Sequence, residues 1–94
     1  MADLYTTARK LERHLKGLSH HWRIHILLLL NEAGRDGLSL DDISSKLKMD
    51  IKNISHHTSK LEQAGLLDKS RRGRTVSHKL SPYGKKFVQF LSLL

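Results

Sequence analysis

The sequence contains no cysteine, which excludes disulfide bonds and thiolate metal sites and is compatible with an intracellular protein. Aromatic residues make up only 5% of the chain, so a core must be built mainly from leucine and isoleucine. The longest apolar run, residues 26–30, is far too short to span a bilayer. The N-terminal segment also lacks the apolar centre of a signal peptide. We therefore expect a soluble, cytoplasmic protein with no membrane contact.

Acidic residues are scarce relative to basic ones. Nine Asp and Glu stand against 17 Lys and Arg, which gives a net charge of +8. Such a balance favours a polyanionic partner, with nucleic acid first and an anionic membrane second, although it can also serve solubility alone. The 94 residues predict one domain with a modest core, and such a core is often completed by a partner chain.

The N-terminal part predicts two helices. An apolar stripe with spacings of four, three, four and three residues is typical of one helical face, and it comprises Leu4, Ala8, Leu11, Leu15 and Leu18. This stripe can pack on its own domain or against a helix of a partner. Ser19 is the predicted N-cap of the next helix, which is expected to run to Ala33. Residues 22–30 are apolar nearly all round and predict a central, buried helix.

Two further helices are separated by a very short connection. Ser39 and Asp42 form a predicted capping box at the start of a short helix whose Ile43 and Leu47 face inward. Asp50 is the predicted cap of a longer helix that ends at Gly65, with Ile54, Thr58 and Leu61 facing the core. Two helices of this kind, only a few residues apart, predict a helix-turn-helix.

A hairpin and a last helix complete the expected order. Residues 66–70 and 75–80 predict two short strands, and Gly73 between them can take the positive φ of a hairpin tip. Ser81 and Pro82 suit the N-cap and first turn of a helix that is expected to run to the end of the chain. The predicted fold is therefore mainly α with a small β-hairpin, in the order α-α-α-α-β-β-α. Residues 1–94 are expected to form a single winged helix-turn-helix domain.

Three stretches of this sequence resemble the arsenic-repressor type (ArsR/SmtB) of winged-helix transcription regulators. They are LSHHWRIHILLLL at residues 18–30, NISHHTSKLEQAGLL at residues 53–67 and the glycine-tipped RRGRTVSHKLS at residues 71–81. The ending LSPYGKKFVQFL is more similar to the multiple-antibiotic-resistance (MarR) type. The resemblance implies a DNA-binding transcription regulator. Thr58 departs from the leucine that is usual in the family. The usual metal-sensing sites are also missing, because residues 40–48 lack Cys and residues 83–94 lack His, Asp and Glu.

The predicted recognition helix, at about residues 51–64, would enter the major groove of DNA. Asn53 and His56 are short enough to read base edges, whereas Lys52 and Lys60 suit phosphates. The alternative is an ordinary solvated helix face. The outward residues expected to contact DNA are Lys52, Asn53, Ser55, His56, Ser59 and Lys60.

The hairpin tip, residues 70–75, carries three arginines, Arg71, Arg72 and Arg74. Cations crowded on a tip favour a minor groove or its flanking phosphates as a partner, while a solvated loop is the competing interpretation. Arg35 and Lys46 are weaker candidates for phosphate contacts.

The seven histidines do not predict a metal site or a catalytic centre. His57 is expected to border the core. His21 and His25 are the one pair at i, i+4 spacing, and a third ligand from His14 or His20 would still be needed for stable zinc binding. No nucleophile elbow or phosphate-binding loop is present, so we expect no enzyme, no metal and no cofactor.

The terminal helices, at about residues 3–17 and 82–94, are expected to form a homodimer interface, with a monomer in which both fold back as the alternative. The predicted interface residues are Leu4, Ala8, Leu11, Leu15, Phe87, Phe90, Leu91 and Leu94. The favoured function is a sequence-specific, nucleoid-associated transcription regulator, with repression as the expected outcome, acting on double-stranded DNA. A protein assembly module and a low-specificity DNA-coating protein are the alternatives.

Overall fold

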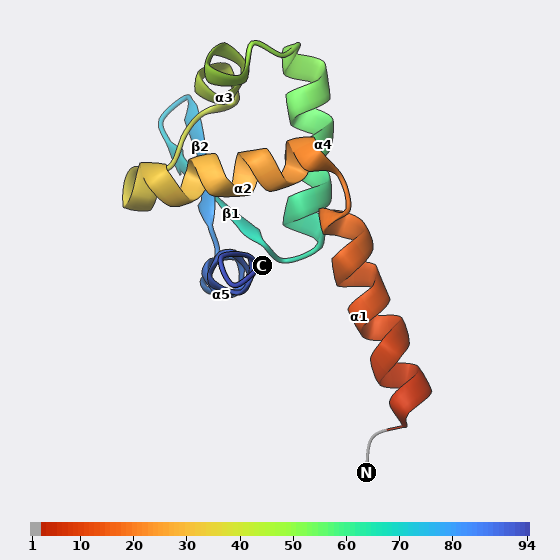
Figure 1. The fold of residues 1–94 in the computed structure, drawn as a ribbon. Helices are drawn as coiled ribbons and strands as arrows, with labels where there is room; N and C mark the ends of the chain where they lie inside the picture. Colours follow the sequence, from red (N-terminus) through yellow and green to blue (C-terminus); the bar gives the residue numbers. More distant parts are fainter. Residues whose placement is uncertain (1–2) are drawn as a thin grey trace.

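The computed structural model describes residues 3–94, and at residues 14, 17 and 18 it describes the backbone alone. Within that range the order is α-α-α-α-β-β-α, as predicted, with one 3-10 turn after the second helix (Figure 1). The elements are α1 (Leu4–Leu18), α2 (His21–Ala33), η1 (Gly34–Asp36), α3 (Leu40–Leu47), α4 (Ile51–Gln63), β1 (Leu67–Arg72), β2 (Thr75–Leu80) and α5 (Pro82–Leu91). This is a winged helix-turn-helix.

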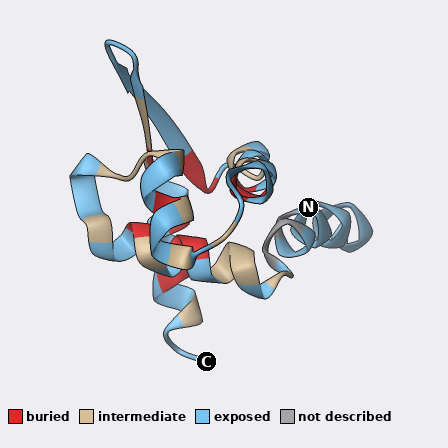
Figure 2. Ribbon diagram, turned by 90° about the horizontal axis from the view of Figure 1, so that it is seen from above, coloured by how far each residue is buried: buried red, intermediate tan, exposed pale blue. Residues whose placement is uncertain are grey.

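The core forms around α2, which packs against α4, α5 and the hairpin (Figure 1). Aliphatic side chains fill it, each contributing about 1.5–3 kcal/mol on burial. Leu28 is an exception on α2, because 45% of its surface is exposed, so this helix is not buried all round. The buried apolar residues, red in Figure 2, are Ile26, Leu27, Leu30, Ile43, Ile54, Leu61, Leu66, Leu67, Leu80 and Val88.

The caps of the helix-turn-helix follow the sequence in part. The capping box is confirmed: the Asp42 backbone N–H donates to the Ser39 hydroxyl at 3.1 Å, and the Ser39 N–H donates to the Asp42 carboxylate at 3.3 Å. Asp50 occupies the N-cap of α4, as expected, but its side chain accepts no capping hydrogen bond. Between the two helices Lys48 adopts the left-handed conformation, with φ of 53°, which produces the sharp turn.

The prediction of Ser19 as the cap of α2 is wrong. His20 holds that position, and its Nδ1 accepts a hydrogen bond from the Trp22 N–H at 3.2 Å. Ser19 instead closes α1, donating its hydroxyl to the Lys16 carbonyl at 3.1 Å. An imidazole nitrogen in the right orientation therefore replaces the hydroxyl as the acceptor for the first turn of α2.

The start of α5 is tied to the end of α4. The Ser81 hydroxyl donates to the Gly65 carbonyl at 2.6 Å and accepts from the Gly84 N–H at 2.9 Å, so Ser81 is the N-cap that the sequence predicted. Gly84 is needed there because a Cβ atom would collide with the Leu66 carbonyl. The helix ends at Leu91 rather than at the end of the chain, so the expected helix at residues 82–94 is three residues too long.

Candidate nucleic-acid interface

Helix α4 is amphipathic, and its two faces have separate roles. Ile54, Thr58 and Leu61 are buried, as predicted, and fix the helix on the core. The opposite face consists of Lys52, Asn53, His56, Ser59 and Lys60, all exposed, with Ser55 half-buried at its edge. These outward side chains form no hydrogen bond or ion pair with other residues that the structure describes. A row of polar and cationic groups is thus free to bind a partner.

The first strand of the hairpin extends farther than the sequence predicted, and the turn is shorter. Arg71 pairs with Val76 and Arg72 pairs with Thr75, so both arginines lie in β1 and only Gly73 and Arg74 form the turn. Gly73 has the positive φ, 60°, that a tip of two residues requires. The strand expected at residues 66–70 therefore ends two residues too early, and the three arginines around Gly73 are all exposed.

The hairpin arginines divide between the two sides of the wing. Arg74 lines a groove of about 690 Å³ between α4 and the hairpin, which also receives Lys69, Ser55 and Ser59. Arg72 lines a separate cleft on the other side, together with Arg35 and Lys79. Within β1 the two sides differ because successive strand residues point to opposite faces, so Lys69 lies on the groove side and Ser70 on the cleft side. Arg74 reaches the groove from the turn. The sequence did not indicate that Ser55 and Ser59 would face the wing.

The groove beside the wing is not uniformly basic. Asp41 and Asp42, from the first turn of α3, line it as well. Asp42 is held in the capping box, so its carboxylate is already hydrogen bonded. The cations of this groove, Lys69 and Arg74, come from the hairpin. The Lys69 ammonium is paired with the Glu62 carboxylate at 3.2 Å, so Arg74 at the turn is the main source of positive charge on this side of the wing.

His57 links α4 to α2, as an interior histidine rather than a ligand. It is 9% exposed, and its Nδ1 accepts a hydrogen bond from the Arg23 Nε at 3.3 Å. Its ring also lies against that of His20, with centroids 4.7 Å apart. The predicted position at the core border is confirmed, but the contact with Arg23 was not predicted, because it joins residues 34 positions apart.

Burial lowers the pKa of His57 below the ordinary value of 6.5, and the charges of His20 and Arg23 lower it further. Burial also lowers the pKa of His78, together with the charge of Lys69, while Glu62 and the Leu38 backbone act in the opposite direction. Both imidazoles are therefore neutral in the folded protein at neutral pH. The Nδ1 of His78 is buried and has no hydrogen-bond partner among the described residues.

These two histidines predict loss of stability in acid. A histidine whose pKa is lowered by folding binds its proton more readily in the unfolded chain, so the stabilisation is complete above pH 6.5 and is lost as the pH falls through the lowered pKa. We expect the free energy of unfolding to fall with a slope of up to about 1.4 kcal/mol per pH unit for each histidine. His57→Gln should reduce that slope in denaturant titrations at fixed protein concentration. His25→Gln, at an exposed position, controls for the loss of one imidazole, and equal slopes for the two variants would contradict the assignment.

A second surface is apolar and lies between the two terminal helices. Leu11 and Leu15 of α1 face Tyr83, Phe87 and Phe90 of α5 across a groove of about 320 Å³, with Lys86 at its border. Leu11, Leu15 and Phe90 remain more than half exposed. The structure thus brings together much of the apolar surface that the sequence placed at the ends of the chain.

The other residues predicted at this surface lie outside the groove. Leu4 and Ala8 are exposed farther along α1. Leu91 is half-buried, and Leu94 follows the end of α5 with 90% of its surface exposed. The side chain of Leu18 lies outside the described residues.

The described residues contain no group of three or more histidine and acidic side chains that could hold a metal ion. His21 and His25 are both exposed and both flank the Trp22 ring, with centroid distances of 5.1 Å and 6.0 Å. The side chain of His14, a possible third ligand, lies outside the described residues. None of the helices described is long and apolar enough to cross a bilayer.

Comparison with known proteins shows which family this sequence matches. The family described as "Bacterial regulatory protein, arsR family" matches residues 22–69, from α2 into β1. The arsenical resistance operon repressor of Escherichia coli strain K12 is 35% identical over 68 residues, which are 72% of this chain. The match covers 56% of that repressor, so the chain spans little more than half the length of this curated relative.

Solved structures resemble nearly the whole chain. Reduced HlyU from Vibrio cholerae is 27% identical, with a TM-score of 0.78 over 94% of this chain and 90% of that one. A domain of Mb0332 from Mycobacterium bovis, described as homodimeric, winged helix-turn-helix and DNA-binding, is 21% identical. Its TM-score is 0.79 over 98% of this chain and 87% of that one, a likeness that concerns the fold.

Proposed function

The chain belongs to the arsR family of bacterial regulatory proteins, and we propose that it is a homodimeric transcription regulator that binds a specific DNA sequence and represses the adjacent promoter. As a member of a family of regulatory proteins, it is a regulator and not an enzyme. Repression is proposed because the relative from Escherichia coli is a repressor by name. The proposal places the protein in the cytoplasm, associated with the nucleoid.

The observation that carries the proposal is the free outer face of α4. A helix with its side chains is about 10–12 Å across, and the major groove of DNA is about 12 Å wide, so an exposed helix face fits it. Asn53 and His56 present both donors and acceptors on that face, which suits base edges. Lys52 and Lys60 present cations alone, which suit phosphates and set the register without reading sequence.

The wing supports the same assignment. Arg74 and Lys69 point into the groove beside α4, and Arg71 and Arg72 extend along the exposed hairpin. A hairpin with these cations can lie against a minor groove or the phosphates that border it, next to the major groove that α4 occupies.

The dimer is supported by the apolar groove between α1 and α5. Large exposed apolar patches are uncommon on stable monomers. A second copy related by a two-fold axis would cover the groove with the same surface of its own. It would also place two α4 helices about one DNA turn, ~34 Å, apart, so the operator would be an inverted repeat.

A selection of bound duplexes from a random pool tests the proposal. A regulator should prefer its selected site over random DNA by about 10³–10⁷-fold at moderate salt. A DNA-coating protein would bind both equally, with a steep salt dependence in each case. A protein assembly module would bind neither, and either of these two outcomes would contradict the proposal.

Removing arginines from the wing is expected to weaken DNA binding without changing its sequence preference. Arg72→Ala with Arg74→Ala should weaken binding to selected and random duplexes alike, because phosphates carry no sequence information. The plot of log affinity against log salt should become less steep by about one unit for each phosphate that the variant no longer binds. Lys48→Ala with Lys85→Ala removes the same charge from exposed positions outside α4 and the wing. If both pairs change the slope equally, the wing does not bind phosphate itself.

A further inference from the structure

A basic groove separates α1 from α4. It measures about 570 Å³ and is lined by Lys10, Arg13 and Lys16 of α1, Arg23 of α2, Lys60 and Gln63 of α4, and Ala64 at the end of α4. Five of its seven lining residues are cations, and none carries a carboxylate. Cations from three helices repel one another across such a gap, so the arrangement favours an anion between them.

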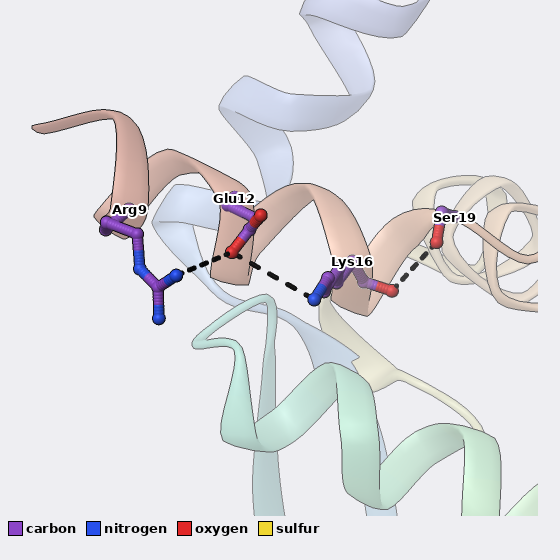
Figure 3. Close-up of polar contacts among 4 residues, drawn as sticks. All are labelled: Arg9, Glu12, Lys16 and Ser19. Carbon is purple, nitrogen blue, oxygen red and sulfur yellow. Dashed lines mark hydrogen bonds and ion pairs between the residues drawn. The ribbon is translucent and has the colours of Figure 1, made fainter. Parts of the chain in front are cut away.

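Glu12, the acidic residue of α1 near the groove, does not neutralise the positive charge of the groove. Glu12 lies 4.0 Å from both Arg9 and Lys16 (Figure 3), and it does not line the groove. These pairs are exposed and therefore weak. The orientation of the Arg23 side chain is fixed by the hydrogen bond that its Nε donates to the Nδ1 of His57. Glu12 thus offsets at most one of the five cations.

The groove continues the surface that is proposed to bind DNA. Lys60 belongs both to the groove and to the outer face of α4, and Gln63 follows it one turn later on the same side. Ser55 and Ser59, on the other flank of α4, face the wing. Helix α4 is therefore a ridge between two grooves, one closed by the hairpin and the other by α1.

A helix inserted in a major groove has a phosphate backbone on each flank. Resting on the proposed function, we infer that the groove between α1 and α4 holds the DNA backbone on the side of the recognition helix opposite the wing. Lys10, Arg13 and Lys16 contact successive phosphates of that strand, and α1 acts as a second clamp. Figure 1 shows α1 projecting from the body beside the end of α4, where it extends the molecule to 46 Å in its longest dimension.

The two faces of α1 make this role compatible with the dimer. Lys10 and Arg13 lie on the side of the helix opposite Leu4, Ala8 and Leu11, because 3.6 residues complete one turn. A partner copy that covers the apolar side leaves the cations open. The described side chains of α1 are all exposed in the single chain, so the helix has surface for both contacts (Figure 2).

The test removes the charges of the clamp and keeps the helix. Lys10→Gln, Arg13→Gln and Lys16→Gln are combined in one variant, and its binding to the selected site and to random duplex is measured over a range of salt. We expect the slope of log affinity against log salt to become less steep by about 0.9 for each phosphate released, or about 2.7 for three. The preference for the selected site over random DNA should change by less than about two-fold, since phosphate contacts carry no sequence information.

A matched variant distinguishes the effect of losing the groove cations from the effect of lowering the net charge of the protein. Arg9→Gln, Lys48→Gln and Lys85→Gln remove the same three charges from exposed positions that neither line this groove nor lie on α4 or the wing. The slope of this scattered variant should stay close to that of the wild type. Thermal unfolding of both variants checks that each retains the fold.

Two outcomes would overturn the inference and leave the proposed function standing. In one, the wild type prefers its selected site and both variants change the salt slope equally. In the other, the slopes again agree, but inorganic pyrophosphate binds the DNA-free wild type and not the groove variant, which would make the groove a small-anion site. A wild type that binds no duplex at all would overturn the proposed function itself.

Discussion

Replacing Leu11 and Phe90 with lysine is expected to dissociate the proposed dimer into folded monomers. Both side chains line the apolar groove between α1 and α5, and each is 52% exposed, so neither is needed for the core of its own chain. Burying two lysines against a partner copy without counter-charges costs far more than leaving them in water. Sedimentation should therefore give the mass of one chain, 10.8 kDa, at concentrations where the wild type gives twice that mass.

The same variant should bind an inverted-repeat operator about 10²–10⁴-fold more weakly, because two linked recognition helices gain from effective concentration and one alone does not. The two added positive charges by themselves favour DNA, so a loss of affinity cannot come from charge. Thr6→Lys with Gln89→Lys adds the same charge at exposed sites on the same helices that do not line the groove, and it should remain a dimer. A wild-type mass of one chain at micromolar concentration would contradict the interface.

Leu91, which the sequence places in the interface, is a poorer site for this experiment. It is half-buried in the single chain, so a charge there would disturb the packing of α5 on α2. Phe90 lies beside it and is more exposed. Of the eight residues predicted for the interface, Leu11, Leu15, Phe87 and Phe90 line the groove. The sequence pattern could not order the eight by burial, since burial depends on how α5 sits on the body.

Local chemistry explains which features could be predicted. The Ser39 and Asp42 box needs only residues three apart, and the buried positions Ile54, Thr58 and Leu61 follow from helical periodicity. Both appear in the structure as expected. The residue pattern of one element was sufficient in each case.

Features that depend on contacts between elements were missed. The hydrogen bond from Arg23 to His57 exists only because α2 crosses α4. Arg71 and Arg72 belong to β1 because strand pairing continues up to the two-residue turn of Gly73 and Arg74, whereas composition alone suggested a loop. The convergence of Lys10 and Lys60 on one groove depends on the angle between α1 and α4, which no pattern within either helix encodes.

The side chains that would read the DNA sequence are Asn53 and His56, and their removal should reduce specificity more than affinity. Asn53→Ala and His56→Ala are each expected to lose about 1–3 kcal/mol of binding to the selected site, with a smaller loss on random duplex. The two residues are three positions apart on one helix face, so the losses in the double variant need not add. Competition between selected and random duplexes at one salt concentration measures both quantities.

The expected pattern distinguishes base reading from simple attraction. Both side chains are exposed, so alanine should change the free energy of unfolding by no more than about 0.5 kcal/mol, and any change in binding reports on the interface. Lys52→Ala, on the same face, is the matched control: losing a phosphate-binding cation should weaken binding to selected and random DNA equally. If His56 reads bases, a new random-pool selection with the His56→Ala variant should show a weaker base preference at particular positions of the site. The base preference at the other positions should stay unchanged. An unchanged selected sequence, with equal losses on both duplexes, would instead show that α4 contacts the DNA backbone alone and that specificity arises elsewhere on the surface.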